Sequence, residues 1–373
     1  MQSNSHFLAL EAIREVAALR LDDGNWSDVE DYARAFYHVD SGGGDTDFVD
    51  FRATTISTTQ SIEFANVDLH LGTNLISMKE QTFCPHWRAD PQFFDHFRRR
   101  IFVHNGCDAM IFAPSRVVAS GLEVIDLTHV WAHNWFHFLI EVVSLLAAPE
   151  VRESNLRILV NRSALKGNFL QALQILGAKY IDRIVPAGAW GTVECKMLVR
   201  PHGVWEPSHF NKDLSGTDHQ NCHFSDPIAA RAFYKKAWPT RRPKKTKIVI
   251  RRPKTSIARC LNEEAFIDYF VANGYSAVSP ETLNFSDQVA LFYDADVIAG
   301  ISGAAFANLV FCRPETRIVC ARNSKSGSVT YAKIAEGLGL NFRYHDGETN
   351  GDSAIPDFAV FEVNPEVMLA QAG

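Results

Sequence analysis

The sequence predicts an α/β protein with parallel sheets, built as two domains. Short runs of Val, Ile and Leu, typical of buried strands, alternate with helical stretches in both halves of the chain. A basic stretch broken by prolines, residues 239–246, separates the two halves and is the expected linker. At 373 residues the chain is also longer than one ordinary hydrophobic core supports.

The first half is expected to hold a helical segment over residues 1–45 and an α/β domain over residues 46–238. A glycine-rich turn or linker at residues 41–47 leads into a region of short strands, residues 49–118. Alternating elements follow: a strand at 122–127, a helix at 128–147, a strand at 156–160, a helix at 165–176 ended by Gly177, a strand at 180–185 and a helix at 228–238.

The second half, residues 247–373, repeats the alternation and is expected to form a second domain. Its helices carry recognisable ends, with Asn262 as an N-cap and with Gly274 and Gly339 after the last turns. The predicted strands are 247–250, 275–278, 297–299, 317–320 and 341–344, and the predicted helices are 262–273, 286–293, 304–311 and 329–338.

Charge and cysteine usage exclude several classes of protein. The net charge of −6 argues against a nucleic-acid partner. Seven cysteines, an odd number without a CxxC pair, indicate reduced thiols and a cytoplasmic protein. Acidic residues interrupt any N-terminal signal segment, and no apolar run reaches the roughly 20 residues that span a bilayer. Peripheral contact with the inner face of a membrane stays open, as does the oligomeric state.

A group of cations follows the strand 247–250, where an open α/β sheet binds its ligands. Arg251, Arg252, Lys254 and Arg259 are the cations, and the planar guanidinium fork suits phosphate oxygens. The alternative, with equal weight, is a solvated basic loop that continues the linker.

A second candidate anion site is the strand-to-helix turn that starts at Gly300. Small residues from Gly303 to Ala305 would let a phosphate approach the N–H groups of the helix start. Tight packing of the helix on the sheet is the commoner reason for such a glycine pair. Asp294 and Asp296 resemble a DxD metal motif, but they fall at a helix end and a strand start, so no metal is expected there.

A candidate base lies in the first half. The i, i+4 spacing of His137 and Glu141 puts both on one helix face, where the carboxylate can orient the imidazole. The alternative is a structural core histidine. His129, His133 and His137 share an i, i+4, i+8 spacing, which raises a metal site, but no HExxH motif supports one. A loose histidine and cysteine cluster around His209 suggests a loop near an acceptor.

Four ordered motifs resemble glycosyltransferase family 61. Asn134-Trp-Phe-His-Phe-Leu-Ile-Glu141 is similar to the family's N-[YW]-F-H-W-L-[IL]-[DE] helix. The remaining three motifs are Arg251-Arg252 with Arg259-x-Leu-Asn-Glu-Glu264, then Ser286-Asp-Gln-Val-Ala-Leu-Phe292, then Gly300-Ile-Ser-Gly-Ala-Ala-Phe-Ala-Asn308. The likeness covers roughly residues 120–345.

The resemblance implies a GT-B fold, in which two Rossmann-like domains face each other across a cleft. It implies inverting, metal-independent transfer from a nucleotide sugar, with a UDP-sugar as the expected donor. It implies no cofactor. The acceptor would be a saccharide or lipid-linked saccharide in capsule-type surface polysaccharide biosynthesis. The implied catalytic residues are His137 and Glu141, and the implied acceptor residues are Asn134 and His209. The implied donor residues are Arg251, Arg252, Arg259, Ser302, Gly303, Ala304, Ala305 and Asn308.

Three positions depart from the family pattern. Ser302 replaces the signature histidine, Ala305 replaces a glycine, and Ile250 replaces a serine before the arginine pair. The first two motivate an alternative function, a degenerate non-catalytic protein that binds a nucleotide or a sugar. A phosphate-handling enzyme on a doubly wound sheet is a third reading, and the lack of a P-loop or nucleophile motif counts against it.

Overall fold

The computed structural model describes part of the chain. The described residues are 46–54, 61–71, 75–78, 81–83, 102–104, 108–114, 117–129, 131–188, 191–201, 203–206, 222–253, 260–349 and 359–373. The helical segment expected over residues 1–45, the candidate acceptor residue His209, and the cations Lys254 and Arg259 lie outside these ranges.

The first half contains a ten-stranded sheet in the order β5-β6-β1-β4-β3-β2-β10-β7-β8-β9. Strands β10, β7, β8 and β9 run parallel to one another, whereas β2 pairs with β10 in the antiparallel sense. The strands are β1 (Thr46–Thr54), β2 (Ile62–Leu71), β3 (Leu75–Met78), β4 (Gln81–Phe83), β5 (Phe102–His104), β6 (Asp108–Pro114), β7 (Val117–Asp126), β8 (Arg157–Asn161), β9 (Ile184–Ala187) and β10 (Gly191–Arg200). A two-stranded ladder joins β11 (Trp205–Glu206) to β12 (His223–Phe224).

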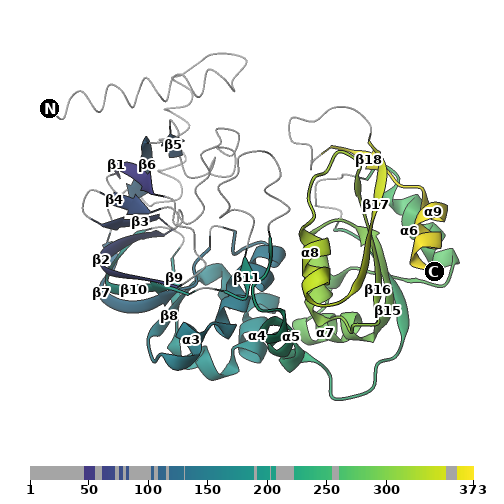
Figure 1. Ribbon diagram of the computed structural model, residues 1–373, viewed down its shortest axis with the longest axis horizontal. Helices are drawn as coiled ribbons and strands as arrows, with labels where there is room; N and C mark the ends of the chain where they lie inside the picture. The colour runs from purple at the N-terminus through teal and green to yellow at the C-terminus, as the bar shows by residue number, and fades with distance from the viewer. Residues whose placement is uncertain are drawn as a thin grey trace, which may run out of the picture.

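The helices of this half pack beside the sheet (Figure 1). They are the π-helical η2 (His137–Val142), the 3-10 helices η3 (Val143–Ala147), η4 (Arg162–Leu165), η5 (Ala178–Arg183) and η8 (Lys235–Ala237), and the α-helices α3 (Pro149–Glu153), α4 (Gly167–Leu176) and α5 (Pro227–Tyr234). The strands expected at 122–127 and 156–160 and the helices expected at 165–176 and 228–238 are confirmed.

Two sequence predictions in this half are wrong in part. The helix predicted from residue 128 begins at Trp135, because Asp126 holds Thr128 in a tight turn and the Asn134 side chain then accepts the N–H of Phe136 at 2.9 Å. The strand predicted at 180–185 starts only at Ile184. The residues before Ile184 form the 3-10 helix η5. At its start the N–H of Tyr180 donates to the carbonyl of Gly177.

The second half is a six-stranded sheet in the order β14-β13-β15-β16-β17-β18, of which the first five strands are parallel. Its strands are β13 (Thr246–Ile250), β14 (Ser276–Val278), β15 (Ala295–Ile301), β16 (Arg317–Asn323), β17 (Asn341–Thr349) and β18 (Phe361–Glu362). Its helices are α6 (Glu263–Ala272), η9 (Pro280–Thr282), α7 (Phe285–Asp294), the 3-10 helix η10 (Ala304–Phe311), α8 (Thr330–Gly337) and α9 (Pro365–Ala372). All the elements predicted from 247 to 344 are confirmed in kind, although Ala304–Phe311 is a 3-10 helix.

Alternating side chains of the central strands bury both faces of this sheet. On β13, Val249 packs with Phe266 of α6 and Met368 of α9, while Ile248 and Ile250 point to the opposite face. Helices α7, η10 and α8 cover that opposite face. The Asn262 side chain was predicted to cap α6, but it instead bonds the backbone of Val363 and fixes the segment before α9.

The two halves share one apolar cluster rather than meeting only at the linker. Helix α4 packs on α7, where Asn168 donates to the carbonyl of Leu283 at 2.8 Å and Gln171 accepts the N–H of Phe285 at 2.9 Å. In the first half the Tyr234 hydroxyl of α5 donates to the carbonyl of Leu139, and the Tyr234 ring contacts Phe311 of the second half, with centroids 5.9 Å apart. In Figure 1 these helices lie between the two sheets. The α/β class is confirmed, and both sheets contain parallel strands, although the first sheet also has antiparallel pairs such as β1 with β6 and β2 with β3.

Candidate active site

The carboxyl ends of β13 and β15 meet where the strand order of the second sheet reverses. The chain passes from β13 to β14 on one side and later to β15 on the other, so this edge is a topological switch point, the usual place for a ligand. Ile250 pairs with Gly300, which brings the loops after both strands together. A Cβ placed on Gly303 would lie 3.5 Å from Nε of Arg252.

Arg252 has a buried nitrogen that lacks a hydrogen-bond partner among the described residues. Its backbone N–H donates to Glu263 at 3.0 Å, which fixes the start of the loop. Its Nη1 is buried and has no hydrogen-bond partner in the described structure. A buried guanidinium nitrogen without an acceptor is costly, and a bound anion would offset that cost.

Arg251 differs from its neighbour. Its Nη1 is 2.9 Å from a carboxylate oxygen of Glu264, and the two side chains are 34% and 62% exposed. An exposed pair of this kind contributes little to stability and leaves the guanidinium accessible. The structure therefore separates the two predicted donor arginines: Arg252 lies at the glycine turn, and Arg251 lies on the surface.

The two glycines of the turn have different roles. A Cβ on Gly300 would lie 2.9 Å from Cβ of Ile250 and 3.3 Å from the Phe306 ring, so packing accounts for this glycine. Gly303 has an extended backbone that any residue can adopt, and beside it stands the Arg252 side chain. Its carbonyl accepts a hydrogen bond from the Tyr331 hydroxyl at 2.7 Å. The packing interpretation holds for Gly300, whereas Gly303 lies at the candidate anion site.

Ser302 and Ala305, two of the three positions that depart from the family pattern, have defined surroundings in the structure. The backbone N–H of Ser302 donates to Ala321 on β16. Burial raises the pKa of the Cys320 thiol, and a hydrogen bond with Ser302 partly offsets that rise. Ala305 is half-buried against the apolar cluster, beside Ala304 in the first turn of η10.

Asn308 joins the two motif regions. Its side chain is fully buried, with Oδ1 accepting from the Trp135 indole at 3.1 Å and Nδ2 donating to Gln288 and to the carbonyl of Ala305. Phe136 contacts the Tyr331 ring, with centroids 5.8 Å apart. Asn308 has no exposed atom, so in this structure it holds the segments together and does not contact a ligand directly.

Tyr331 is a site residue that sequence reasoning missed. It bonds Gly303 and packs against Phe136, and it therefore contacts both motif regions. Only its position in the first turn of the predicted helix 329–338 could have indicated it.

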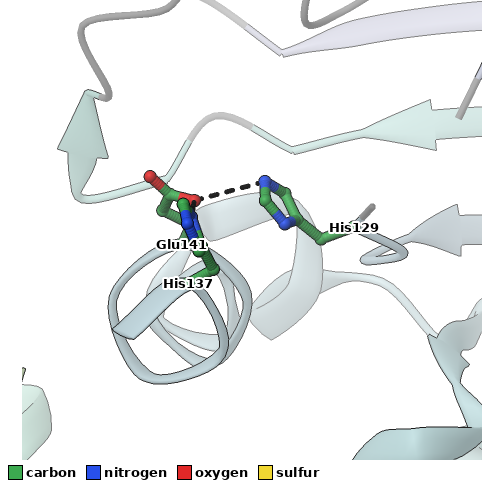
Figure 2. Close-up of side chains that lie close together, drawn as sticks. All are labelled: His129, His137 and Glu141. Carbon is green, nitrogen blue, oxygen red and sulfur yellow. Dashed lines mark hydrogen bonds and ion pairs between the residues drawn. The ribbon is translucent and has the colours of Figure 1, made fainter. Parts of the chain in front are cut away.

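The predicted base lies in a cluster that Figure 2 shows, on the π-helical turn η2. Nδ1 of His137 is 2.6 Å from Oε2 of Glu141, and the same oxygen is 3.2 Å from Nε2 of His129. The Glu141 and His129 side chains are each only 7% exposed, against 22% for His137. Ligand atoms of the three lie within 4.8 Å of one another, a spacing that could hold a metal ion.

The i, i+4, i+8 pattern of His129, His133 and His137 is only partly matched, because His129 and His137 contact Glu141 and His133 lies outside this cluster. His129 precedes the helix, and its backbone N–H donates to Asn161 at the end of β8. Its ring stacks on His137, with centroids 5.4 Å apart. His133 is exposed on the intervening turn. The position of His129 just after the predicted strand 122–127 is the signal that could have singled it out.

Two further predicted residues have local partners. Asn134 caps the start of the helical segment through its Oδ1. Asp294 forms a two-point ion pair with Arg241, at 2.7 and 2.8 Å, and Asp296 pairs with Arg313. Burial raises the pKa of Asp294, but the hydrogen bonds from Arg241 and the Lys244 N–H outweigh it and leave that pKa lowered. The two carboxylates of the DxD-like motif thus hold cationic side chains.

Comparison with known proteins agrees with the sequence resemblance. No curated protein matches the chain. No helix in the described residues is both long and apolar enough to cross a membrane. A protein-family model, Glycosyltransferase 61, matches residues 135–319. This range runs from Trp135, one residue after the start of the first motif, into β16, and so includes His137, Arg252 and Gly303. Residues 135–319 therefore form a domain of glycosyltransferase family 61.

Proposed function

We propose that this protein is an inverting glycosyltransferase that moves a sugar from a nucleotide sugar to a saccharide or lipid-linked saccharide. The family domain supports glycosyl transfer. The observation that carries the proposal is the buried Nη1 of Arg252, beside Gly303 at the switch point, for which the described residues offer no hydrogen-bond partner. That position suits the diphosphate of the donor, because a phosphate oxygen would accept a hydrogen bond from the Arg252 guanidinium and its negative charge would balance the positive charge there.

The leaving group is the chemical reason for these residues. As the bond between the anomeric carbon and the diphosphate oxygen breaks, negative charge builds on the diphosphate. Arg252 supplies a fixed cation, and the first N–H groups of η10, from Ala304 and Ala305, supply dipoles. We take a UDP-sugar as the first donor to test, and we propose metal-independent transfer.

His137 is the better candidate for the base. The carboxylate of Glu141 accepts the proton of Nδ1, so the lone pair of the neutral ring is on Nε2. Within the described residues Nε2 has no hydrogen-bond partner. In a direct displacement, Nε2 would take the proton of the acceptor hydroxyl while the acceptor oxygen attacks the anomeric carbon and the diphosphate leaves. Glu141 would then stabilise the imidazolium.

A GT-B arrangement would place donor and acceptor on opposite halves. In each half, candidate groups follow the carboxyl end of a parallel strand: His129 after β7, and Arg252 after β13. The Trp135–Asn308 hydrogen bond and the Phe136–Tyr331 contact support an approach of the two regions. We place the division between donor and acceptor domains at residues 239–246. We propose a cytoplasmic enzyme of capsule-type polysaccharide synthesis, at the inner face of the membrane.

The test is release of a nucleoside diphosphate from a panel of nucleotide sugars, with oligosaccharide and lipid-linked acceptors. The His137→Ala variant should lose at least about 100-fold in kcat, the usual contribution of a general base, while it still binds UDP. His133→Ala, an exposed histidine on the preceding turn, is the matched control. An inverted product confirms the stereochemistry.

The degenerate, non-catalytic alternative rests on Ser302 and Ala305. Binding of a nucleoside diphosphate without turnover for any acceptor would favour that alternative. A protein that neither binds nor releases a nucleoside diphosphate would refute both readings.

A further inference from the structure

We propose that His129 is a positioning residue for the base: it shares the Glu141 carboxylate with His137 and so sets the orientation and proton affinity of the His137 ring. This inference rests on the proposed function, because it assigns His137 the role of base. His129 lies outside every sequence motif that indicates the family.

The tautomer of His129 follows from its contacts. The backbone N–H of Trp131 donates to Nδ1 of His129 at 3.1 Å, so Nδ1 carries a lone pair. A neutral imidazole then has its proton on Nε2. That nitrogen lies 3.2 Å from Oε2 of Glu141 and donates to it.

Glu141 therefore receives two imidazole N–H groups on one oxygen, from His129 at 3.2 Å and from His137 at 2.6 Å. Both donors favour the charged carboxylate, which is 7% exposed and needs such partners. The two rings stack at an interplanar angle of 22°. The shared oxygen fixes the carboxylate, and the carboxylate fixes Nδ1–H of His137, which leaves Nε2 for the acceptor.

The sheet holds His129 in place. Its backbone N–H bonds Asn161 at the end of β8. The preceding Thr128 donates twice to the buried Asp126, whose other oxygen pairs with Arg200 at 2.7 Å. The ends of β7, β8 and β10 thus anchor His129. Such support from neighbouring residues is what the precise placement of a functional side chain needs.

The same three atoms could be taken for a metal site, but the tautomer argues against it. A metal-bound imidazole presents a lone pair to the ion and usually donates its other N–H outward. Here the other nitrogen, Nδ1 of His129, accepts a hydrogen bond. The nitrogen that faces Glu141 therefore carries a proton, and the cluster is arranged for protons rather than for an ion.

The titratable groups Cys222, Asp126 and His133 lie around the cluster. Burial raises the pKa of the Cys222 thiol to about 11, with a smaller contribution from the charge of Glu141, so it stays protonated. Asp126 is paired with Arg200 on the sheet side, and His133 lies across Trp131 on the exposed side. The contacts of His137 and His129 with Glu141 hold the cluster itself together.

The test compares His129→Leu, which removes the donor at similar size, with His129→Gln, which keeps an N–H donor. In His129→Leu the Glu141 carboxylate accepts a hydrogen bond from His137 alone. That bond becomes stronger and stabilises the protonated ring of His137. We expect the acid limb of the pH profile of kcat to move up by about one pH unit, kcat at a pH below this limb to fall by up to about tenfold, and KM for the donor to stay within about twofold. His129→Gln should recover most of kcat and the original acid limb.

A loss of activity without movement of the acid limb, or equal losses in both variants, would show a merely structural role and overturn the proposal. A second measurement needs no turnover: long-range ¹H–¹⁵N correlation spectra of the histidine rings. We expect the Nε2–H form for His129 and the Nδ1–H form for His137. An Nδ1–H form of His129, or one equivalent of Zn²⁺ bound in equilibrium dialysis and lost in His129→Leu, would refute the inference. If no nucleotide sugar is turned over, the proposed function fails. The spectra then still show whether His129 donates its Nε2–H to Glu141.

Discussion

The Asn308→Ala substitution tests whether the buried amide joins the two motif regions. Asn308 is fully buried and makes three hydrogen bonds: from Trp135 at 3.1 Å, to Gln288 at 3.3 Å and to the carbonyl of Ala305 at 3.1 Å. Alanine removes all three and leaves the oxygen of Gln288, a residue only 3% exposed, without this donor.

The magnitude follows from the groups left behind. A buried polar group without its partner costs about 1–3 kcal/mol, and the half-buried Trp135 indole should lie at the low end because water can reach it. The space left by the amide adds about 1 kcal/mol. We expect a total loss of about 3–4 kcal/mol in the free energy of unfolding.

Urea denaturation, followed by tryptophan fluorescence, measures this loss. Trp135→Phe is the companion variant, since it keeps an aromatic ring but removes only one of the three bonds; it should cost about half as much. The double mutant should lose less than the sum of the two single losses, because both remove the same bond. A loss below about 1 kcal/mol in Asn308→Ala, or strict additivity, would refute the assigned role.

Two further predictions concern the glycine turn and the first sheet. Gly300→Ala should cost about 1–3 kcal/mol of stability, because its Cβ would press on Ile250 and Phe306. Gly303→Ala should leave stability nearly unchanged but weaken UDP binding about tenfold, and calorimetry of both variants would contradict this if the effects were reversed. Burial lowers the pKa of His70 from 6.5 to about 4, so the folded state binds fewer protons than the unfolded chain between those values. The contribution of neutral His70 to the free energy of unfolding should be fully present above pH 6.5 and should fall by about 3 kcal/mol toward pH 4. In urea titrations, His70→Gln should lack this part of the fall.

Much of the fold could be predicted because its signals are local. The strands of the second sheet are short apolar runs between turn residues, and Gly274 and Gly339 mark helix ends with positive φ values of 84° and 60°. The start of the first motif helix could not be predicted, since the hydrogen bonds of Asp126 and Asn134 with the backbone determine it. Apolar periodicity does not contain that information.

The site was predictable by residue type more than by arrangement. The spacing of His137 and Glu141 identified their contact correctly. The contribution of His129 depends on the end of β7 and on Asn161, and the bond of Trp135 to Asn308 joins residues 173 positions apart. Nor could sequence distinguish Arg251 from Arg252, because the difference lies in which guanidinium Glu264 reaches. These relations arise only in the folded chain, and the bond between Trp135 and Asn308 also requires the two halves to pack together.

The central claim is that Arg252 and the Gly303 turn bind the donor diphosphate, and a thermal-shift titration with UDP tests it most directly. At 100 times its dissociation constant, UDP should stabilise the wild-type protein by about 2.7 kcal/mol. Arg252→Ala should abolish most of this shift, Arg251→Ala should reduce it less, and Arg242→Ala, an exposed arginine before β13, should keep it. A full shift in Arg252→Ala would contradict the account.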